Sequence, residues 1–497
     1  MRFFEVLLSL VCVYLVLIVF FQKLMPDRFR IAAVPAALLV LAAQLIIEGY
    51  RWQLFMIYIF VILFSIIFIL QYARPGIKIW KPLRYILLSI TAIIYSLSVL
   101  LAILLPVVNF DKPNGPYAVG CETHHFIDND RFETLTEDKY DKRELMATIY
   151  YPANVDENSE RKTFFPKEKD AFDKYMAQYA RDLKFPKFII GYWKYFKSNS
   201  IIESNLASGS SSYPVIILCH GMGTGGVLHT IQAENLASNG FIVVVPDHTY
   251  STAATVFPDG RVTGLKTPVN LQNLKVMYDT VGKLWVDDIE FLIKQLDRLN
   301  SETEKSKLAG AIDTGNIGIA GHSFGGTAAF NALLMSSRVR AAFTMDGTLY
   351  PLKEVSEIEK PYMFFTAENY YNQINLFRKK DVTDIDLKEA NLSREQYNML
   401  SPVLTAEADI IDALSKKGDV LYIDQTGHFN FTDLQLFSSL VQYTGMTGKI
   451  NGQRGAEIVN AYMLDFFNFN LKGKAGELLK GPSKQFPEVK FATTPEH

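Results

Sequence analysis

Cysteine is scarce in this chain of 497 residues, which contains only three. Cys12 lies in an apolar run near the N-terminus, so Cys121 and Cys219 form the only pair that a globular part of the chain could oxidise. Three cysteines cannot build the disulfide framework of a small secreted domain. Because Cys219 ends the apolar segment 215–219, it is expected in a buried strand as a free thiol.

Excess charge of one sign and clusters of metal ligands are also lacking. The formal net charge is −2, and no stretch combines basic residues with interleaved aromatic side chains as a nucleic-acid-binding face does. Histidine and cysteine residues do not have the spacing of metal ligands. We therefore expect no metal ion, no other cofactor and no nucleic-acid partner.

Long apolar runs are concentrated in residues 1–110. A helix needs ~20 apolar residues to cross a bilayer, and an apolar character on every side is rare in a soluble helix. The sequence therefore predicts about four transmembrane helices, with three spans and one interfacial segment as the alternative. The runs, which contain at most one charged residue each, are Phe3–Phe21, Ile31–Ile47, Leu54–Leu70 and Tyr85–Val108.

The lysine and arginine residues between these runs predict an orientation. Basic loops tend to stay in the cytoplasm. The loops after the first and third runs are basic, whereas the loop after the second contains only Arg51; Arg2 argues weakly for the opposite orientation. We expect a multi-pass protein of the plasma membrane whose N-terminus and residues 111–497 are extracytoplasmic. The basic loops contain Lys23, Arg28 and Arg30, and Arg74, Lys78, Lys81 and Arg84.

A glycine-rich sequence in the remaining part indicates chemistry. Gly321-His322-Ser323-Phe324-Gly325 follows the apolar run 317–320 and precedes a stretch typical of a helix. A serine on a sharp strand-to-helix turn is lifted out of the sheet, where its hydroxyl can attack an ester carbonyl. The flanking glycines allow the close backbone approach that this turn needs. Ser323 is thus predicted to be a nucleophile; the alternative is a serine that only caps a helix.

Such a serine needs a histidine base and a carboxylate that orients the histidine. In hydrolases of this kind the carboxylate residue follows the serine in the chain, and the histidine follows the carboxylate residue. Only His428 and the terminal His497 follow Ser323, and His428 lies in a loop after an apolar strand, so it is the expected base. Asp346 and Glu368 end two successive apolar runs, and either could be the acid. Position alone favours Asp346 only slightly.

An oxyanion hole is predicted from an earlier loop. His220-Gly221-Met222-Gly223 directly follows the strand expected at 215–219. A loop of this type supplies one backbone N–H, and the residue after the nucleophile supplies the second. Met222 and Phe324 are therefore the expected oxyanion donors. His220 and His322 are interpreted as residues that orient these loops.

Apolar runs of the parallel-sheet type alternate with helical segments through residues 111–497. This pattern predicts an α/β-hydrolase fold with a mostly parallel central sheet, preceded by the all-α transmembrane region of residues 1–110. Insertions are expected near 155–205 and 370–418. The first is rich in aromatic residues and lysine, which suits a lid or a lipid-facing surface as well as a helical excursion packed on the core.

From about Gly115 to Gly473 the chain resembles the plasma-type platelet-activating factor acetylhydrolases. That resemblance implies a calcium-independent serine hydrolase that removes short or oxidised acyl chains from the second glycerol position of phospholipids, and it assigns the acid to Asp346. The stretch after Glu368 is longer than the family pattern, and the family's secreted members lack the N-terminal region. The motifs concerned are Gly115–Cys121, Tyr150–Pro152, His220–Gly223, Gly321–Gly326, Met345–Pro351 and Gly427–Asp433.

The sequence as a whole predicts a membrane-anchored serine ester hydrolase that acts on lipid or short-chain esters. Its expected partners are an ester or phospholipid substrate and the lipid bilayer. A lipase, a polyester hydrolase or an acyltransferase with the same three catalytic residues is one alternative. The other is a membrane receptor that retains a catalytically inactive hydrolase domain.

Overall fold

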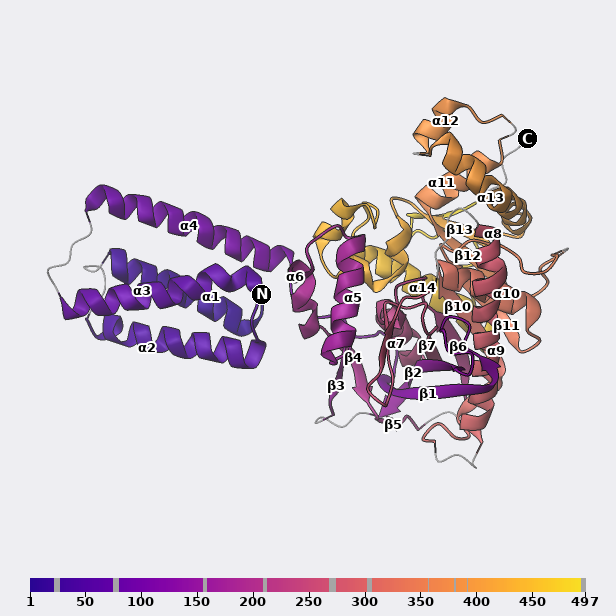
Figure 1. Ribbon diagram of the computed structural model, residues 1–497, viewed down its shortest axis with the longest axis horizontal. Helices are drawn as coiled ribbons and strands as arrows, with labels where there is room; N and C mark the ends of the chain where they lie inside the picture. The colour runs from indigo at the N-terminus through magenta and orange to yellow at the C-terminus, as the bar shows by residue number, and fades with distance from the viewer. Residues whose placement is uncertain are drawn as a thin grey trace. The chain divides into compact units, whose positions relative to one another are not determined.

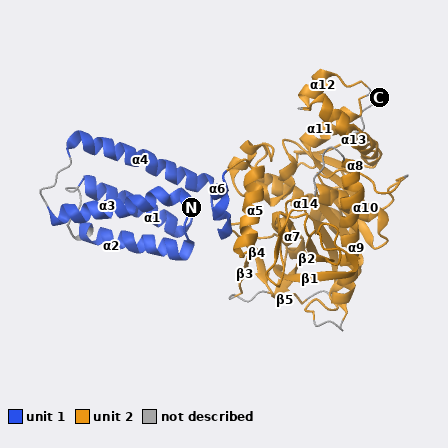
Figure 2. Ribbon diagram, viewed as in Figure 1, with its two compact units in different colours: residues 1–108, 186–195 blue, residues 109–185, 196–497 orange. Residues whose placement is uncertain are grey.

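The computed structural model divides the chain into two compact units. The helical unit comprises Met1–Val108 and Pro186–Tyr195, and the sheet unit comprises Asn109–Phe185 and Phe196–His497 (Figure 2). Lys23, Lys78 and His497 lie outside the described residues, and so does the side chain of Arg28. The described residues are 1–21, 27–74, 80–154, 159–208, 212–267, 274–301, 306–355, 357–379, 381–390 and 392–492.

Four long apolar helices form the helical unit (Figure 1). Leucine, isoleucine and phenylalanine side chains fill its interior, and many more of the same kinds remain exposed on its outside. By length and composition alone, each helix could cross a membrane. The helices are α1 (Phe3–Phe20), α2 (Asp27–Ala43, continued by the π-helical turn η2, Gln44–Glu48), α3 (Phe55–Ala73, preceded by the 3-10 turn η3, Trp52–Leu54) and α4 (Lys81–Leu104).

One end of the helical unit contains a buried ion pair and an aromatic contact. The guanidinium of Arg51 is fully buried and donates to the Glu5 carboxylate at 2.9 Å. The Trp52 indole N–H donates to the Ile189 carbonyl at 3.1 Å, and its ring lies 5.6 Å from that of Phe188. Residues 187–195, which form α6 (Lys187–Ile190) and η4 (Gly191–Tyr195), therefore pack within the helical unit.

A 12-stranded mixed sheet organises the second unit. Its strands run in the order β14-β13-β12-β11-β10-β6-β7-β2-β1-β4-β3, with β5 beside β2. The central strands from β13 to β7 are parallel, whereas β14 and β2 pair antiparallel at the two sides of this block. The strands are β1 (Ala118–Phe132), β2 (Lys142–Asn154), β3 (Arg161–Thr163), β4 (Lys197–Ile202), β5 (Asn205–Leu206), β6 (Tyr213–Cys219), β7 (Ile242–Asp247), β10 (Ile312–His322), β11 (Val339–Met345), β12 (Tyr362–Ala367), β13 (Val420–Ile423) and β14 (Val489–Phe491); β8 (Ala254–Val256) and β9 (Val262–Gly264) pair separately.

Helices cover both faces of this sheet. Alternate residues of β6 point to opposite sides: Val215 and Ile217 contribute to one apolar core, Ile216 and Leu218 to the other. A strand buried on both faces is apolar throughout, which explains the continuous runs in the sequence. The main helices are α5 (Lys169–Asp182), α7 (Thr230–Ser238, after the 3-10 turn η5, Gly226–His229), α8 (Leu274–Met277), α9 (Lys283–Asn300, after the π-helical turn η7, Tyr278–Gly282), α10 (Phe324–Met335), α11 (Glu368–Phe377), α12 (Asp384–Glu389), α13 (Arg394–Ser415) and α14 (Gly452–Lys472). The 3-10 turns η8 (His428–Phe431), η9 (Asp433–Leu436) and η10 (Ser439–Thr444) fill the segment between β13 and α14.

The prediction of an α/β-hydrolase fold after a helical N-terminal region is confirmed by this topology. The prediction of a buried free thiol is confirmed as well, because Cys219 is fully buried and forms no disulfide. The segment near 370–418, where an insertion is expected, contains α11, α12 and α13, which gather beside β12 and β13 (Figure 1). In the segment near 155–205, where the other insertion is expected, the sheet-unit side chains Phe164, Phe165 and Tyr175 are buried, and the rings of Phe164 and Phe165 contact that of Phe437.

Candidate active site

The chain makes a sharp turn between β10 and α10, and Ser323 stands at its apex. Its backbone has φ 56° and ψ −123°, a region that side-chain-bearing residues rarely adopt. A Cβ at Gly321 would overlap the Gly325 carbonyl, and a Cβ at Gly325 would overlap the His220 carbonyl. Only glycine fits at these two positions, so the sequence enforces the strained turn that presents the serine hydroxyl.

Three side chains from the carboxyl ends of separate strands meet at this turn. His428 Nε2 lies 3.0 Å from Ser323 Oγ, and His428 Nδ1 lies 2.6 Å from Asp346 Oδ2. The Asp346 carboxylate is almost completely buried, whereas the His428 ring is about two-fifths exposed. The structure thus brings together the serine, histidine and aspartate that the sequence singled out, in a linear relay from carboxylate to hydroxyl.

Asp346 is held in place by the adjacent strand β12. Its Oδ1 accepts hydrogen bonds from the Thr366 hydroxyl at 2.6 Å and from the Ala367 N–H at 2.7 Å. These two donors leave Oδ2 for the His428 imidazole. Glu368, the alternative acid, instead accepts the Gln425 N–H at 2.6 Å. Thr366 and Ala367 were not predicted from the sequence, although their position at the end of the strand after Asp346 was an available signal.

The loop after β6 is fixed through the carbonyl of Gly221. That oxygen accepts one hydrogen bond from His220 Nδ1–H at 2.7 Å and another from the Thr224 hydroxyl at 2.7 Å. The N–H of His248 donates to His220 Nε2 at 3.2 Å, which sets the tautomer of this ring. Burial lowers the pKa of His220 well below its usual value, so the ring is neutral. Because Gly221 C=O and Met222 N–H belong to one planar peptide, these contacts also fix the direction of the Met222 N–H.

His322 supports the histidine loop rather than the reacting atoms. Its Nε2 lies 3.0 Å from the main-chain carbonyl of His428, to which it donates a hydrogen bond. The ring is fully buried, and burial lowers its pKa well below the ordinary value, so it is neutral as well. The contact fixes the backbone from which the His428 ring projects.

A buried carboxyl from α13 anchors the loop after Asp346. Glu407 Oε1 accepts the Leu349 N–H at 2.8 Å, and Oε2 accepts the Tyr370 hydroxyl at 2.9 Å. Burial raises the pKa of Glu407 to about 8. The 370–418 segment is therefore tied to the loop that follows Asp346, a connection for which the sequence offered no signal.

Metal ligation has no candidate in the part of the chain that the structure describes. Within these residues, no group of three or more histidine, cysteine, aspartate or glutamate side chains is arranged to hold an ion.

Comparison with known proteins supplies the family. The model of the family "Platelet-activating factor acetylhydrolase, isoform II" matches residues 103–282 and 283–478. The chain belongs to this family. Among the members, the platelet-activating factor acetylhydrolase of Bos taurus is 23% identical over 349 residues, which span 62% of this chain and 72% of that protein. The protein of the same name from Cavia porcellus is 24% identical over 383 residues, spanning 71% of this chain and 76% of the relative.

A solved structure extends the comparison to the fold. A ferulic acid esterase from Streptomyces cinnamoneus superposes with a TM-score of 0.55 at 21% sequence identity, covering 77% of this chain and 98% of that one. At this identity the likeness concerns the fold. Membership of the acetylhydrolase family identifies the chain as an ester-hydrolysing enzyme.

Proposed function

We propose that this acetylhydrolase-family protein is a membrane-anchored serine hydrolase of lipid or short-chain esters. The observation that carries the proposal is the pair of contacts at His428, 3.0 Å to Ser323 Oγ and 2.6 Å to Asp346 Oδ2. Ser323 is the nucleophile, His428 the general base and acid, and Asp346 the group that orients His428 and stabilises its charged form. Residues 111–497 form the catalytic domain in this proposal.

The reaction follows from these roles. Ser323 Oγ attacks the ester carbonyl while His428 Nε2 takes the hydroxyl proton, and the carbonyl becomes a tetrahedral oxyanion. The N–H groups of Met222 and Phe324 stabilise that oxyanion. His428 then delivers its proton to the leaving alcohol, which gives an acyl-enzyme on Ser323. Water, deprotonated by His428, attacks the acyl carbonyl and releases the carboxylic acid.

The substrate class rests on the family and on the helical unit. The relatives are named for acetyl hydrolysis of platelet-activating factor, a lipid ester. The four apolar helices, of 18 to 24 residues in their candidate spans, support anchoring in a bilayer. An anchored hydrolase meets substrates that reside in the membrane or at its surface, so we propose a lipid or short-chain ester, deacylated as in the phospholipase reaction.

The basic loops support an orientation. Arg74, Lys81 and Arg84 flank the loop between the third and fourth helices, whereas the loop between the second and third carries only Arg51. Because basic loops tend to stay in the cytoplasm, the loop between the third and fourth helices is cytoplasmic in this proposal. The N-terminus and the catalytic domain are then extracytoplasmic, and the membrane is the plasma membrane in this proposal.

The deciding experiment is active-site labelling with a fluorophosphonate, which modifies only an activated serine. Membranes containing the wild type and Ser323→Ala are labelled, and the modified peptide is identified by mass spectrometry. We expect labelling of the wild type on Ser323 and none of Ser323→Ala with an unchanged melting temperature. If the folded wild-type protein stays unlabelled although the probe can reach it, the catalytically inactive receptor becomes the better proposal.

The same probe tests orientation when it is made membrane-impermeant. Intact and permeabilised cells are labelled side by side, with a cytoplasmic serine hydrolase as the control for leakage. Equal labelling in the two preparations supports an extracytoplasmic catalytic domain. Labelling that appears only after permeabilisation would place the domain in the cytoplasm and reverse the proposed topology.

A further inference from the structure

A second pocket lies in the sheet unit away from the residues of the proposed catalytic mechanism. It has a volume of about 580 Å³, which falls within the range of small-molecule sites, and none of Ser323, Asp346 and His428 lines it. Its floor is formed by β2 and β7, and its walls by the β3–α5 segment, by β8 and by the start of α7. The proposed mechanism gives this pocket no role.

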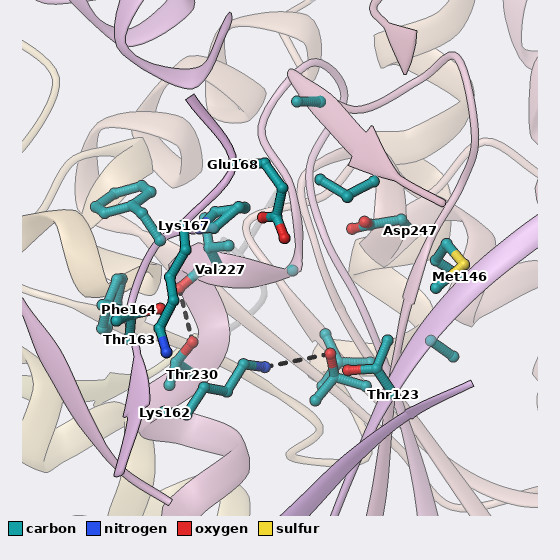
Figure 3. Close-up of a pocket in the computed structure, with 18 of the residues that line it drawn as sticks. Thr123, Met146, Lys162, Thr163, Phe164, Lys167, Glu168, Val227, Thr230 and Asp247 are labelled. Carbon is teal, nitrogen blue, oxygen red and sulfur yellow. Dashed lines mark hydrogen bonds between the residues drawn. The ribbon is translucent and has the colours of Figure 1, made fainter. Parts of the chain in front are cut away.

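Lys162 is one of four charged side chains that line the pocket, with Lys167, Glu168 and Asp247. Its side chain extends into the space with the ammonium group toward the side on which Thr123 lies (Figure 3). The ammonium donates to the Thr148 hydroxyl and to the Tyr150 hydroxyl, both at 3.3 Å, which are long hydrogen bonds. Within the described part of the chain, no carboxylate comes within 4.0 Å of this ammonium. Lys162 is therefore a sheltered cation that lacks an ion-pair partner.

Asp247 is a carboxylate that acts electrostatically on Lys162 but forms no ion pair with it. It ends β7 in the floor of the pocket, apart from Lys162 (Figure 3), and burial raises the pKa of Asp247 to about 7, so the carboxyl is about half protonated near neutral pH. Lys167, at the rim, is already paired with Glu160 at 2.6 Å. Glu168 lines the pocket too, but its carboxylate forms no ion pair with Lys162. Of the two lysines that line the pocket, Lys162 is therefore the one without an ion-pair partner among the described residues.

The hydroxyl groups around Lys162 favour an anion as well. Thr148 accepts from the ammonium, so its own O–H proton remains to be donated to a ligand. A sheltered charge without a partner is costly, and a bound anion would supply both an ion pair and charge-assisted hydrogen bonds. The ligand atom that meets Lys162 is therefore an oxygen of a carboxylate or a phosphate.

The remaining wall is apolar. Phe165 and Phe257, together with Val245 and Val256, line the space next to the polar end. Burying a hydrocarbon chain against this wall stabilises the bound state by about 25 cal/mol per Å² of apolar surface removed from water. A ligand that satisfies both ends of the pocket is consequently a small amphiphile, with an oxyanion head and a short apolar tail.

We propose that this pocket binds an anionic amphiphile, its head held by Lys162 and Thr148 and its tail by the phenylalanine wall. This goes beyond the proposed function, because none of the three proposed catalytic side chains takes part. Two sources share the required chemistry: the carboxylic acid released by ester hydrolysis, and the phosphate end of a lipid. Gly226 and Val227, three and four residues after Gly223 of the proposed oxyanion loop, line the same pocket.

The test measures binding by isothermal titration to the full-length protein in lipid nanodiscs. Hexanoate and hexyl phosphate are the two anionic probes, hexylammonium is the cationic control, and empty nanodiscs correct for partitioning. The titrations are repeated after saturation of the catalytic serine with a fluorophosphonate. We expect both anions to bind, hexylammonium not to bind, and the phosphonate to leave anion binding unchanged. Tighter hexanoate binding indicates the acid source, and tighter hexyl phosphate binding the lipid source.

Variants locate the site. Lys162→Met keeps the length of the side chain and removes its charge, and we expect anion affinity to fall about 10- to 100-fold, the effect of losing a hydrogen bond to a charged group. Thr148→Val keeps the shape and removes one hydroxyl, with an expected loss of a few-fold. Lys169→Met, an exposed charge on the same segment outside the pocket, should bind as the wild type does.

Unchanged affinity in folded Lys162→Met, equal binding of hexylammonium, or loss of anion binding after phosphonylation would each overturn the proposal. If Lys162→Met unfolds, Thr148→Val decides the question, and unchanged affinity there has the same meaning. If the phosphonate fails to label the wild type, the proposed catalytic function fails, while the comparison of Lys162→Met with Lys169→Met still tests the pocket.

Discussion

Asp346→Asn distinguishes a catalytic aspartate from a carboxylate that merely lies near His428. Ala367 is a main-chain donor, so its N–H, 2.7 Å from Oδ1, must face an oxygen in the variant too. The asparagine therefore places its Oδ1 toward Ala367 and its NH2 group toward His428. His428 Nδ1, which donated to Asp346 at 2.6 Å, must now accept. The proton moves to Nε2, which can then no longer take the proton of Ser323.

The magnitude follows from the cost of reversing this arrangement. Turning the amide around restores the active tautomer, but it leaves the buried Ala367 N–H facing an NH2 group, at a cost of about 1–3 kcal/mol. The loss of negative charge beside the imidazolium adds to this. For the same substitution in serine proteases the rate falls about 10⁴-fold, which corresponds to about 5.4 kcal/mol. We expect a similar fall in kcat here with little change in KM.

The assay is hydrolysis of 4-nitrophenyl acetate and the rate of phosphonate labelling, both on full-length protein in nanodiscs. Glu368→Gln is the matched control, because Glu368 contacts the Gln425 N–H and none of the three proposed catalytic residues. We expect it to retain activity within a few-fold. Wild-type labelling by Asp346→Asn, or a large loss in Glu368→Gln alone, would refute the assignment of the acid.

Three further substitutions test the surroundings of the site. Gly321→Ala puts a methyl group against the Gly325 carbonyl, and it should destabilise the fold by about 1–3 kcal/mol or more and abolish labelling; a normal melting temperature with full labelling would contradict the turn geometry. His220→Phe removes the donor to the carbonyl of Gly221 and so disturbs the N–H of Met222, a proposed oxyanion donor. We expect kcat to fall about 10- to 100-fold with a smaller change in KM, and an effect confined to KM would speak against this role. Burial favours the neutral form of Glu407 and raises the pKa of this carboxyl to about 8. The neutral carboxyl therefore contributes fully to the free energy of unfolding below about pH 4.5, and this contribution is lost as pH rises through 8. Glu407→Gln, which stays neutral, should therefore gain melting temperature relative to the wild type between pH 6 and pH 9, and identical pH profiles would contradict the buried position of this carboxyl.

Much of the fold was readable from the sequence because the signals are local. Strands buried on both faces must be apolar throughout, so the runs at 215–219, 317–320, 341–345 and 362–366 each coincide with part of a strand of the central sheet. Chemistry-bearing residues were placed at strand ends because the carboxyl edge of a parallel sheet is where loops converge. Ser323 and His428 were identified from such positions together with chain order.

The choice between the two acids was not local. Asp346 and Glu368 both end apolar runs, and their positions in the sequence favour Asp346 only slightly. In the structure Asp346 has φ 48°, and its Oδ1 accepts a hydrogen bond from the N–H of Ala367 at the end of β12. This contact turns Oδ2 toward His428. The direction of a side chain at a strand end depends on its neighbours in space, so only the resemblance to a family pointed to Asp346 beforehand.

The aromatic insertion shows the same limit. Its amphipathic pattern fitted a lid, a lipid-facing surface or a packed excursion equally well. In the structure Phe164, Phe165 and Tyr175 are buried in the sheet unit, whereas residues 186–195 belong to the helical unit. Amphipathicity records that one side of a segment avoids water, and it does not record which apolar surface receives that side.

The sequence by itself determined the order of helices and strands, the strained glycine turn at Ser323 and the apolar character of residues 1–110, because each depends on neighbouring residues and their periodicity. Tertiary structure alone decided which carboxylate contacts His428 and how Glu407 holds the loop after Asp346. It also placed Lys162 in a pocket without an ion-pair partner among the described residues. These last features join residues that are tens to hundreds of positions apart, and such contacts follow from the packing of the whole sheet rather than from any local pattern.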